Sequence, residues 1–143
     1  MLTDLIAIFP QLATEPYMRT SACSMFYNCI AYAVGDQTKR WDPNQGWHWP
    51  AGVPRQATLA AFTKVFTQLN YRRCSGSELE AGFEKIAIYQ KGNRATHAAR
   101  QLPDGRWTSK LGDLDDITHT LAGLAGDQYG QPARYMRRAV QNP

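Results

Sequence analysis

Three short segments in the second half of the chain constrain the fold most. Residues 83–89 and 96–102 are rich in strand-forming residues and are separated by a short polar turn. The Asp104-Gly105 pair that follows is a strong hairpin signal, and residues 106–110 continue as a third strand. Together these segments predict an antiparallel meander.

Helical patterns surround this meander. Residues 27–34 contain a good N-cap in Asn28 and stop before Gly35, which favours a short helix. Residues 58–69 carry apolar side chains on one helical stripe. Residues 113–124 begin with acidic side chains, which the positive end of a helix dipole prefers, so we expect a third helix there.

The remaining segments are less regular. Residues 1–22 are expected to form a helical or extended lead-in, and residues 74–82 a polar turn region. Residues 36–55 hold three tryptophans and predict an ordered surface loop, because indole rings are costly to leave in water. Residues 132–138 predict a last strand, at a sheet edge because of Pro132.

Length and composition favour one globular unit. The chain has 143 residues, of which 43% are hydrophobic, so we expect a single domain over residues 1–143. The net charge of +4 is modest and the basic residues are scattered, which makes nucleic acid an unlikely partner. The apolar run at residues 5–9 is too short for a signal peptide or a membrane span. We therefore expect a cytoplasmic protein with no membrane partner, or one delivered by a secretion system without a cleaved signal.

The cysteines do not predict a disulfide framework. Their number is three, and no two have CxxC spacing, so at least one thiol is expected to be free. A zinc site is conceivable, but the spacings match no common ligand pattern; its ligands would be Cys23, Cys29, Cys74 and His48. No metal and no cofactor is expected.

Cys29 stands at the predicted start of a helix. Unpaired amides and the dipole there stabilise a thiolate, which predicts a lowered pKa. The same amides can donate to an oxyanion beside the sulfur. The alternative is that Cys29 is a small buried hydrophobic residue.

His97 lies near the start of a predicted strand, beside the small residues Ala98 and Ala99. Such a histidine can accept a thiol proton if another element approaches it, and a third polar group usually orients the ring. Ser109, on the neighbouring strand of the hairpin, is the best-placed candidate. The alternative is a surface histidine without a partner.

Other aromatic and imidazole side chains are candidates for substrate binding. Trp47 and His48 lie in the tryptophan-rich loop and would either line a substrate groove or serve local packing and solvation. Trp107, on the strand beside His97, is a further candidate for substrate binding. His119 is expected to be a surface residue of the third helix.

Three motifs carry a resemblance to a known family: residues 27–35 (YNCIAYAVG), 96–101 (THAARQ) and 104–112 (DGRWTSKLG). On these the chain resembles a family of small uncharacterised bacterial proteins. More distantly it is similar to the NlpC-like branch of papain-like cysteine peptidases and amidases.

The distant resemblance implies a fold and a set of roles. The fold would be α+β and papain-like, with N-terminal helices that carry the cysteine packed on an antiparallel sheet of about four strands. Cys29 would be the nucleophile, His97 the general base, and Ser109 would occupy the third position. Tyr27 or Asn28 would flank the oxyanion hole.

The sequence therefore favours a cysteine-dependent hydrolase that acts on an amide bond through a dyad or triad. A protein or peptide is the expected substrate. The alternative is a catalytically inactive protein-binding module of the same fold, with the tryptophan loop forming its groove.

Overall fold

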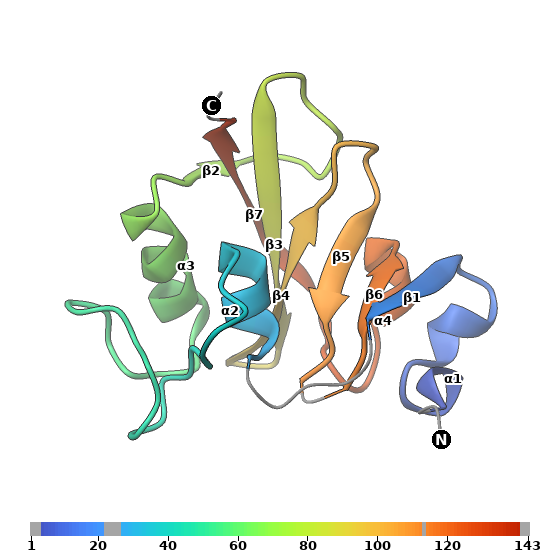
Figure 1. The fold of residues 1–143 in the computed structure, drawn as a ribbon, viewed down its shortest axis with the longest axis horizontal. Coiled ribbons are helices and arrows are strands. Elements are labelled where there is room, and N and C mark those ends of the chain that lie inside the picture. The colour runs from blue at the N-terminus through green and yellow to red at the C-terminus, as the bar shows by residue number, and fades with distance from the viewer. Residues whose placement is uncertain (1–3, 22–26, 113, 141–143) are drawn as a thin grey trace.

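The computed structural model describes residues 4–21, 27–112 and 114–140, and its centre is one seven-stranded antiparallel sheet (Figure 1). The strand order is β1-β6-β5-β4-β3-β7-β2, and every pairing is antiparallel. The strands are β1 (Tyr17–Ser21), β2 (Arg72–Cys74), β3 (Phe83–Lys91), β4 (Arg94–Gln101), β5 (Trp107–Lys110), β6 (Asp116–His119) and β7 (Gln131–Ala139).

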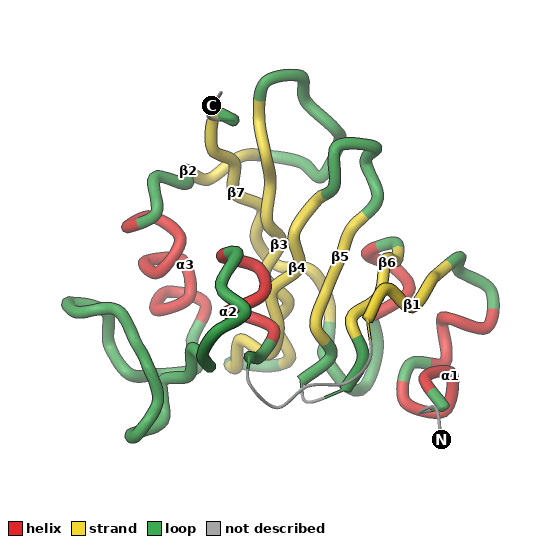
Figure 2. Tube along the Cα trace, viewed as in Figure 1, coloured by secondary structure: helices red, strands yellow, loops and turns green. Residues whose placement is uncertain are grey.

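The helices are short and lie against the faces and one end of the sheet (Figure 2). Among the described residues they are α1 (Leu5–Ile8), the 3₁₀ turn η1 (Pro10–Ala13), α2 (Cys29–Val34), α3 (Leu59–Gln68) and α4 (Leu121–Leu124). The Asn28 side chain caps α2, and Gly35 ends it in the left-handed conformation with φ 90°. Thr58 caps α3 in the same way.

Two apolar clusters cover the two faces of the sheet. The first packs α2 and α3 on strand residues that include Ile86, Ile88 and Ala98. The second packs α1, η1 and α4 on the opposite face, where Tyr89 and Ala99 belong. Because side chains alternate along a strand, these clusters assign each sheet residue to a face.

The predicted meander is confirmed. β3 pairs with β4, and β4 pairs with β5 after the turn at Asp104-Gly105. The helices predicted over 27–34 and 58–69 are also confirmed, as α2 and α3.

The predicted papain-like fold is wrong. The structure is mostly an antiparallel seven-stranded sheet with few short helices, rather than a helical N-terminal part packed on about four strands. The N-terminal segment contributes β1, which pairs with β6 at one edge of the sheet. The sheet has more strands than predicted because β1, β2 and β6 are short and polar. The alternation of apolar and polar residues that identifies a strand is weak in such segments.

The helix predicted over residues 113–124 is also wrong. Asp116–His119 is the strand β6, and only Leu121–Leu124 is helical. β6 lies between β5 and β1, so its backbone is hydrogen-bonded on both sides, which outweighs the acidic helix-start signal.

The last strand was predicted correctly, but its position at an edge was not. β7 lies between β3 and β2, so β2 is the edge strand on this side of the sheet, and the predicted turn region starts at its last residue, Cys74. Pro132 is tolerated because it stands near the start of β7, where the register with β3 shifts.

Candidate functional site

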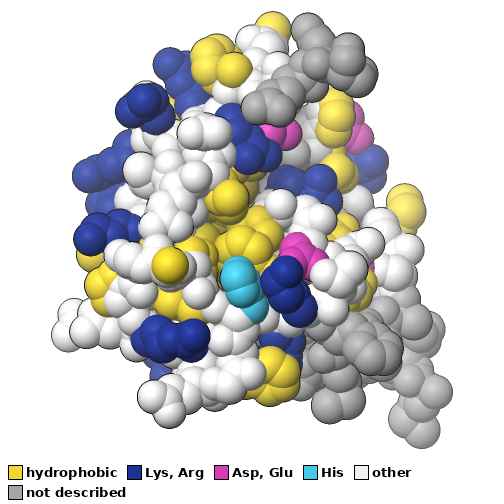
Figure 3. Space-filling model, turned by 60° about the vertical axis from the view of Figure 1, so that its left-hand side comes forward, with side chains coloured by type: hydrophobic (Ala, Val, Ile, Leu, Met, Phe, Trp, Pro, Cys, Tyr) yellow, Lys and Arg dark blue, Asp and Glu magenta, His cyan; other side chains and the backbone are white. Residues whose placement is uncertain are grey.

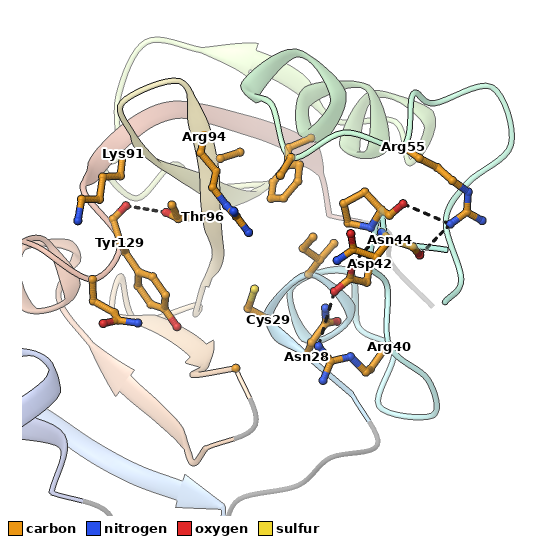
Figure 4. A pocket seen from close by; sticks show the side chains of 17 residues that line it. Asn28, Cys29, Arg40, Asp42, Asn44, Arg55, Lys91, Arg94, Thr96 and Tyr129 are labelled. Carbon is orange, nitrogen blue, oxygen red and sulfur yellow. Dashed lines mark hydrogen bonds and ion pairs between the residues drawn. The ribbon is translucent and has the colours of Figure 1, made fainter. Parts of the chain in front are cut away.

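A pocket of about 560 Å³ opens beside the start of α2 (Figure 4). Cys29 lies between two groups of polar side chains that line it. One group comes from the hairpin of β3 and β4 and from the segment before β7, and the other comes from the N-cap of α2 and the loop after α2. The labelled members are Lys91, Arg94, Thr96 and Tyr129 on one side and Asn28, Arg40, Asp42, Asn44 and Arg55 on the other.

Cys29 is the first residue of α2 and is half-buried. Burial raises the pKa of its thiol to about 11, while backbone hydrogen bonding, first from Ala98, and the charge of Arg40 act in the opposite direction. The predicted lowering of this pKa is therefore wrong. A helix of only six residues stabilises the thiolate by less than the loss of water around the sulfur destabilises it.

His97 and Ser109 are brought together by the sheet. Nε2 of His97 lies 2.9 Å from Oγ of Ser109, and the same Oγ lies 2.7 Å from Nε2 of His119. Nδ1 of His119 lies 2.7 Å from the carbonyl oxygen of Thr120. All three side chains are buried, so the expectation that His119 is a surface residue is wrong.

The carbonyl of Thr120 sets the direction of this hydrogen-bond chain. A carbonyl only accepts, so Nδ1 of His119 carries the proton and Nε2 keeps a lone pair. The hydroxyl of Ser109 then donates to His119 and accepts from the Nε2–H of His97. With its proton on Nε2, neutral His97 keeps a lone pair on Nδ1, which is buried and without a hydrogen-bond partner among the described residues.

Both imidazoles are held neutral. Burial lowers the pKa of His119 to about 4. Burial, together with the nearby His119, lowers the pKa of His97 well below its ordinary value. An unpaired buried nitrogen is uncommon in folded proteins, and His97 Nδ1 is one that can accept a proton.

Cys29 and His97 lie on opposite faces of β4, and no hydrogen bond joins them. Cys29 packs with the cluster that contains Ala98, whereas His97 lies opposite Tyr89 and shares the other face. The sulfur nevertheless lies against the backbone of Ala98, the residue after His97. β4 pairs with β5 only at Arg100 and Gln101, so the ladder is open beside His97.

Tyr129 links the pocket to His97. Its ring is stacked on the imidazole with centroids 4.2 Å apart and an interplanar angle of 10°, and it also lines the pocket. The hydroxyl of Thr96 donates to the Tyr129 carbonyl at 2.6 Å. Gly130 follows with φ 77°, and a Cβ there would overlap the carbonyl of Gln90, so the close approach of this segment to β3 requires glycine.

The residues expected at the oxyanion hole have other partners. Asn28 lines the pocket, but its side-chain oxygen accepts from the N–H groups of Ala31 and Trp41, and its amide donates to the Trp41 carbonyl. Tyr27 lies outside the pocket lining and donates its hydroxyl to Asp116 at 2.7 Å. Asn28 thus anchors the loop that forms one wall, and Tyr27 anchors α2 to β6.

The aromatic candidates do not line the pocket. Trp47 is 47% exposed, with the guanidinium of Arg40 5.0 Å from its ring centre. His48 packs edge-on against Trp41, and Trp107 is buried in the cluster that contains Tyr89. The loop itself is ordered by these contacts, as predicted.

Sequence reasoning missed His119, Tyr129 and the cationic side chains of the pocket. The run Asp116–His119 is short and polar and gives no strand signal of its own, so its pairing with β5, which places His119 near Ser109, is visible only in the folded chain. No sequence signal brings Tyr129 to His97, because the contact depends on where the long segment before β7 returns to the sheet.

The described residues contain neither a cluster of metal-ligating side chains nor a helix that could cross a membrane. No group of three or more His, Cys, Asp or Glu side chains there is arranged to hold a metal ion. Cys23, considered as a zinc ligand, lies outside the described residues. None of the described helices has the length and apolar character needed to cross a membrane.

Comparison with known proteins gives one match. A family model described as a domain of unknown function, DUF7689, matches residues 18–137. No curated protein and no solved structure matches the chain. The matched range contains the pocket, Cys29, and the chain of His97, Ser109 and His119.

Proposed function

The chain belongs to the DUF7689 family, and we propose that it is a cysteine-dependent hydrolase or acyltransferase acting on an amide or ester carbonyl. Cys29 is the nucleophile and His97 the general base. The observation that carries the proposal is the orientation of the Thr120–His119–Ser109–His97 chain, which leaves a lone pair on a buried imidazole nitrogen.

The resting pair is a neutral thiol and a neutral imidazole. The raised pKa of Cys29 and the lowered pKa of His97 both disfavour a standing thiolate–imidazolium pair. Deprotonation therefore accompanies attack rather than preceding it, as in general-base catalysis. This arrangement also protects the thiol from chance alkylation and oxidation, because the thiolate is the reactive form.

The proposed reaction has two halves. The sulfur of Cys29 bonds to the carbonyl carbon, its proton passes to Nδ1 of His97, and the carbonyl electron pair moves to oxygen. Collapse of this adduct breaks the bond to the leaving group, which takes the proton from His97 and leaves a thioester on Cys29. Water then attacks the thioester in the same way, and the acid is released with the free thiol.

Ser109 and His119 act as positioning residues in this scheme. When Nδ1 of His97 receives a proton, Nε2–H continues to donate to Ser109, and Ser109 continues to donate to His119. The ring therefore keeps its orientation through the proton transfer. Because Sγ and Nδ1 are not hydrogen-bonded in this structure, the transfer proceeds through the open side of β4, by closer approach or through one bridging water.

A catalytically inactive binding protein is the second candidate. The raised pKa of Cys29 and its lack of a hydrogen bond to His97 favour it, and in that case the pocket would hold a ligand without changing it. The two candidates differ in whether Cys29 can be acylated by an activated carbonyl compound.

Acylation by p-nitrophenyl acetate separates them. In a variant with Cys23→Ala and Cys74→Ala, we expect release of p-nitrophenolate and an acetyl group on the Cys29 peptide by mass spectrometry. Adding Cys29→Ala should abolish both signals. The proposal would be overturned by a rate for Cys29 no faster than expected for a free thiol of the same pKa, about 11.

A further inference from the structure

We infer that the pocket beside Cys29 binds an anionic group, so that the compounds acted on carry a carboxylate close to the reacting carbonyl. The inference deepens the proposed function and rests on it for the reacting carbonyl. It is carried by the charges that line the pocket and by the pairing of two cations at one wall.

The pocket lining is strongly cationic. Among the described residues it includes four cationic side chains and one carboxylate, that of Asp42. Asp42 lies 3.6 Å from Arg40, so its charge is already opposed. The side of the molecule that carries α3 also shows many more Lys and Arg side chains than acidic ones at its surface (Figure 3). The cations of the lining are Arg40, Arg55, Lys91 and Arg94.

Two of these cations face each other across the hairpin between β3 and β4. Lys91 and Arg94 are a directly paired position of the ladder, and both line the pocket. Like charges placed opposite each other on neighbouring strands destabilise a sheet. The pairing therefore costs stability in the empty pocket, and an anion bound at Arg94 would reduce that cost.

The four cations differ in how much of their bonding capacity is used. Arg55 donates to the carbonyls of the loop after α2, including those of Asn44 and Trp47. Lys91 donates to the Asp127 carbonyl at 2.5 Å. Arg94 is exposed and has no hydrogen-bond or ion-pair partner among the described residues. Its guanidinium is therefore available for a carboxylate, which it can bind through two parallel hydrogen bonds.

The position of Arg94 suits a substrate that also reaches Cys29. Both side chains line the same pocket, and Figure 4 shows Arg94 extending from the hairpin toward the space beside the sulfur. Arg40 acts on the sulfur from the opposite wall, since its charge lowers the pKa of Cys29. A carboxylate held by Arg94 thus leaves the rest of an acyl group within the pocket.

The test compares iodoacetate with iodoacetamide on the variant that keeps only Cys29. Both reagents react with the thiolate, so the ratio of their rates cancels the pKa of Cys29 and reports the charge of the pocket. At about pH 9, we expect this ratio to exceed that of N-acetylcysteinamide by roughly fivefold and to fall with added salt. Arg94→Gln should lower the ratio toward the free-thiol value, and Arg72→Gln, a change of equal charge on β2, should not.

A second arm distinguishes failure of this inference from failure of the proposed function. The mono-p-nitrophenyl ester of glutaric acid should acylate Cys29 faster than p-nitrophenyl butyrate, and Arg94→Gln should remove the difference. Equal acylation rates with both esters, together with an iodoacetate-to-iodoacetamide ratio equal to that of N-acetylcysteinamide, would overturn the anionic pocket. The proposed hydrolase activity would be unaffected by that result. An alkylation preference with no acylation by either ester would overturn the hydrolase and support the anionic pocket.

Discussion

Lowering the pH from about 7 to 4 should remove about 3 kcal/mol from the free energy of unfolding through His119 alone. In the folded protein the pKa of His119 is about 4, against an ordinary value of 6.5. Between these values the unfolded chain binds a proton that the folded protein excludes, so stability falls as the pH falls. The lowered pKa of His97 adds a loss of the same sign.

Urea denaturation at a series of pH values measures this effect. His119→Gln should flatten the dependence between about pH 6.5 and 4, since one of the two buried imidazoles is gone. His48→Gln is the matched control, because His48 is exposed and its removal should leave the dependence unchanged. Equal stability of the wild-type protein at the two ends of this range would contradict the buried neutral chain.

Ser109→Ala should lower the free energy of unfolding by about 3 kcal/mol, because two buried groups lose their partner at once. The Nε2–H of His97 and the Nε2 lone pair of His119 both depend on the Ser109 hydroxyl. Acylation of Cys29 should also slow, by about tenfold, because the His97 ring is no longer held in one orientation.

A control substitution, Ser77→Ala, separates the specific effect of Ser109→Ala from the general effect of removing a serine hydroxyl. The side chain of Ser77 makes no hydrogen bond among the described residues, so Ser77→Ala should change stability by less than about 0.5 kcal/mol. Thermal or urea unfolding of the two variants gives the comparison. A loss below about 0.5 kcal/mol for Ser109→Ala as well would show that the hydroxyl is not shared by the two imidazoles.

The parts of the fold that sequence predicted have local signals. The meander follows from alternating segments and the Asp104-Gly105 turn, and α2 from a cap at each end. β6 has none of this, because Asp116, Thr118 and His119 look like solvent-exposed residues until their partners on β1 and β5 are known. Buried polar side chains are stable only with hydrogen-bond partners, and those partners lie far apart in the chain.

The candidate site shows the same division. Cys29 at a helix start and Ser109 beside His97 follow from local patterns and hairpin pairing. The pKa of Cys29 could not be inferred from position alone, because burial by the surrounding loop and sheet outweighs the helix start. The cations of the pocket come from the hairpin and the loop after α2, which only the folded chain brings together.

The central claim is that Nδ1 of His97 removes the proton from Cys29. The most direct test is the rate of Cys29 acetylation by p-nitrophenyl acetate in the Cys23→Ala, Cys74→Ala background, with and without His97→Gln. Glutamine keeps an N–H donor for Ser109 but has no basic nitrogen, and unfolding curves verify that the variant is folded. We predict a fall of about 10²- to 10⁴-fold at neutral pH. An unchanged acetylation rate in folded His97→Gln would contradict the account.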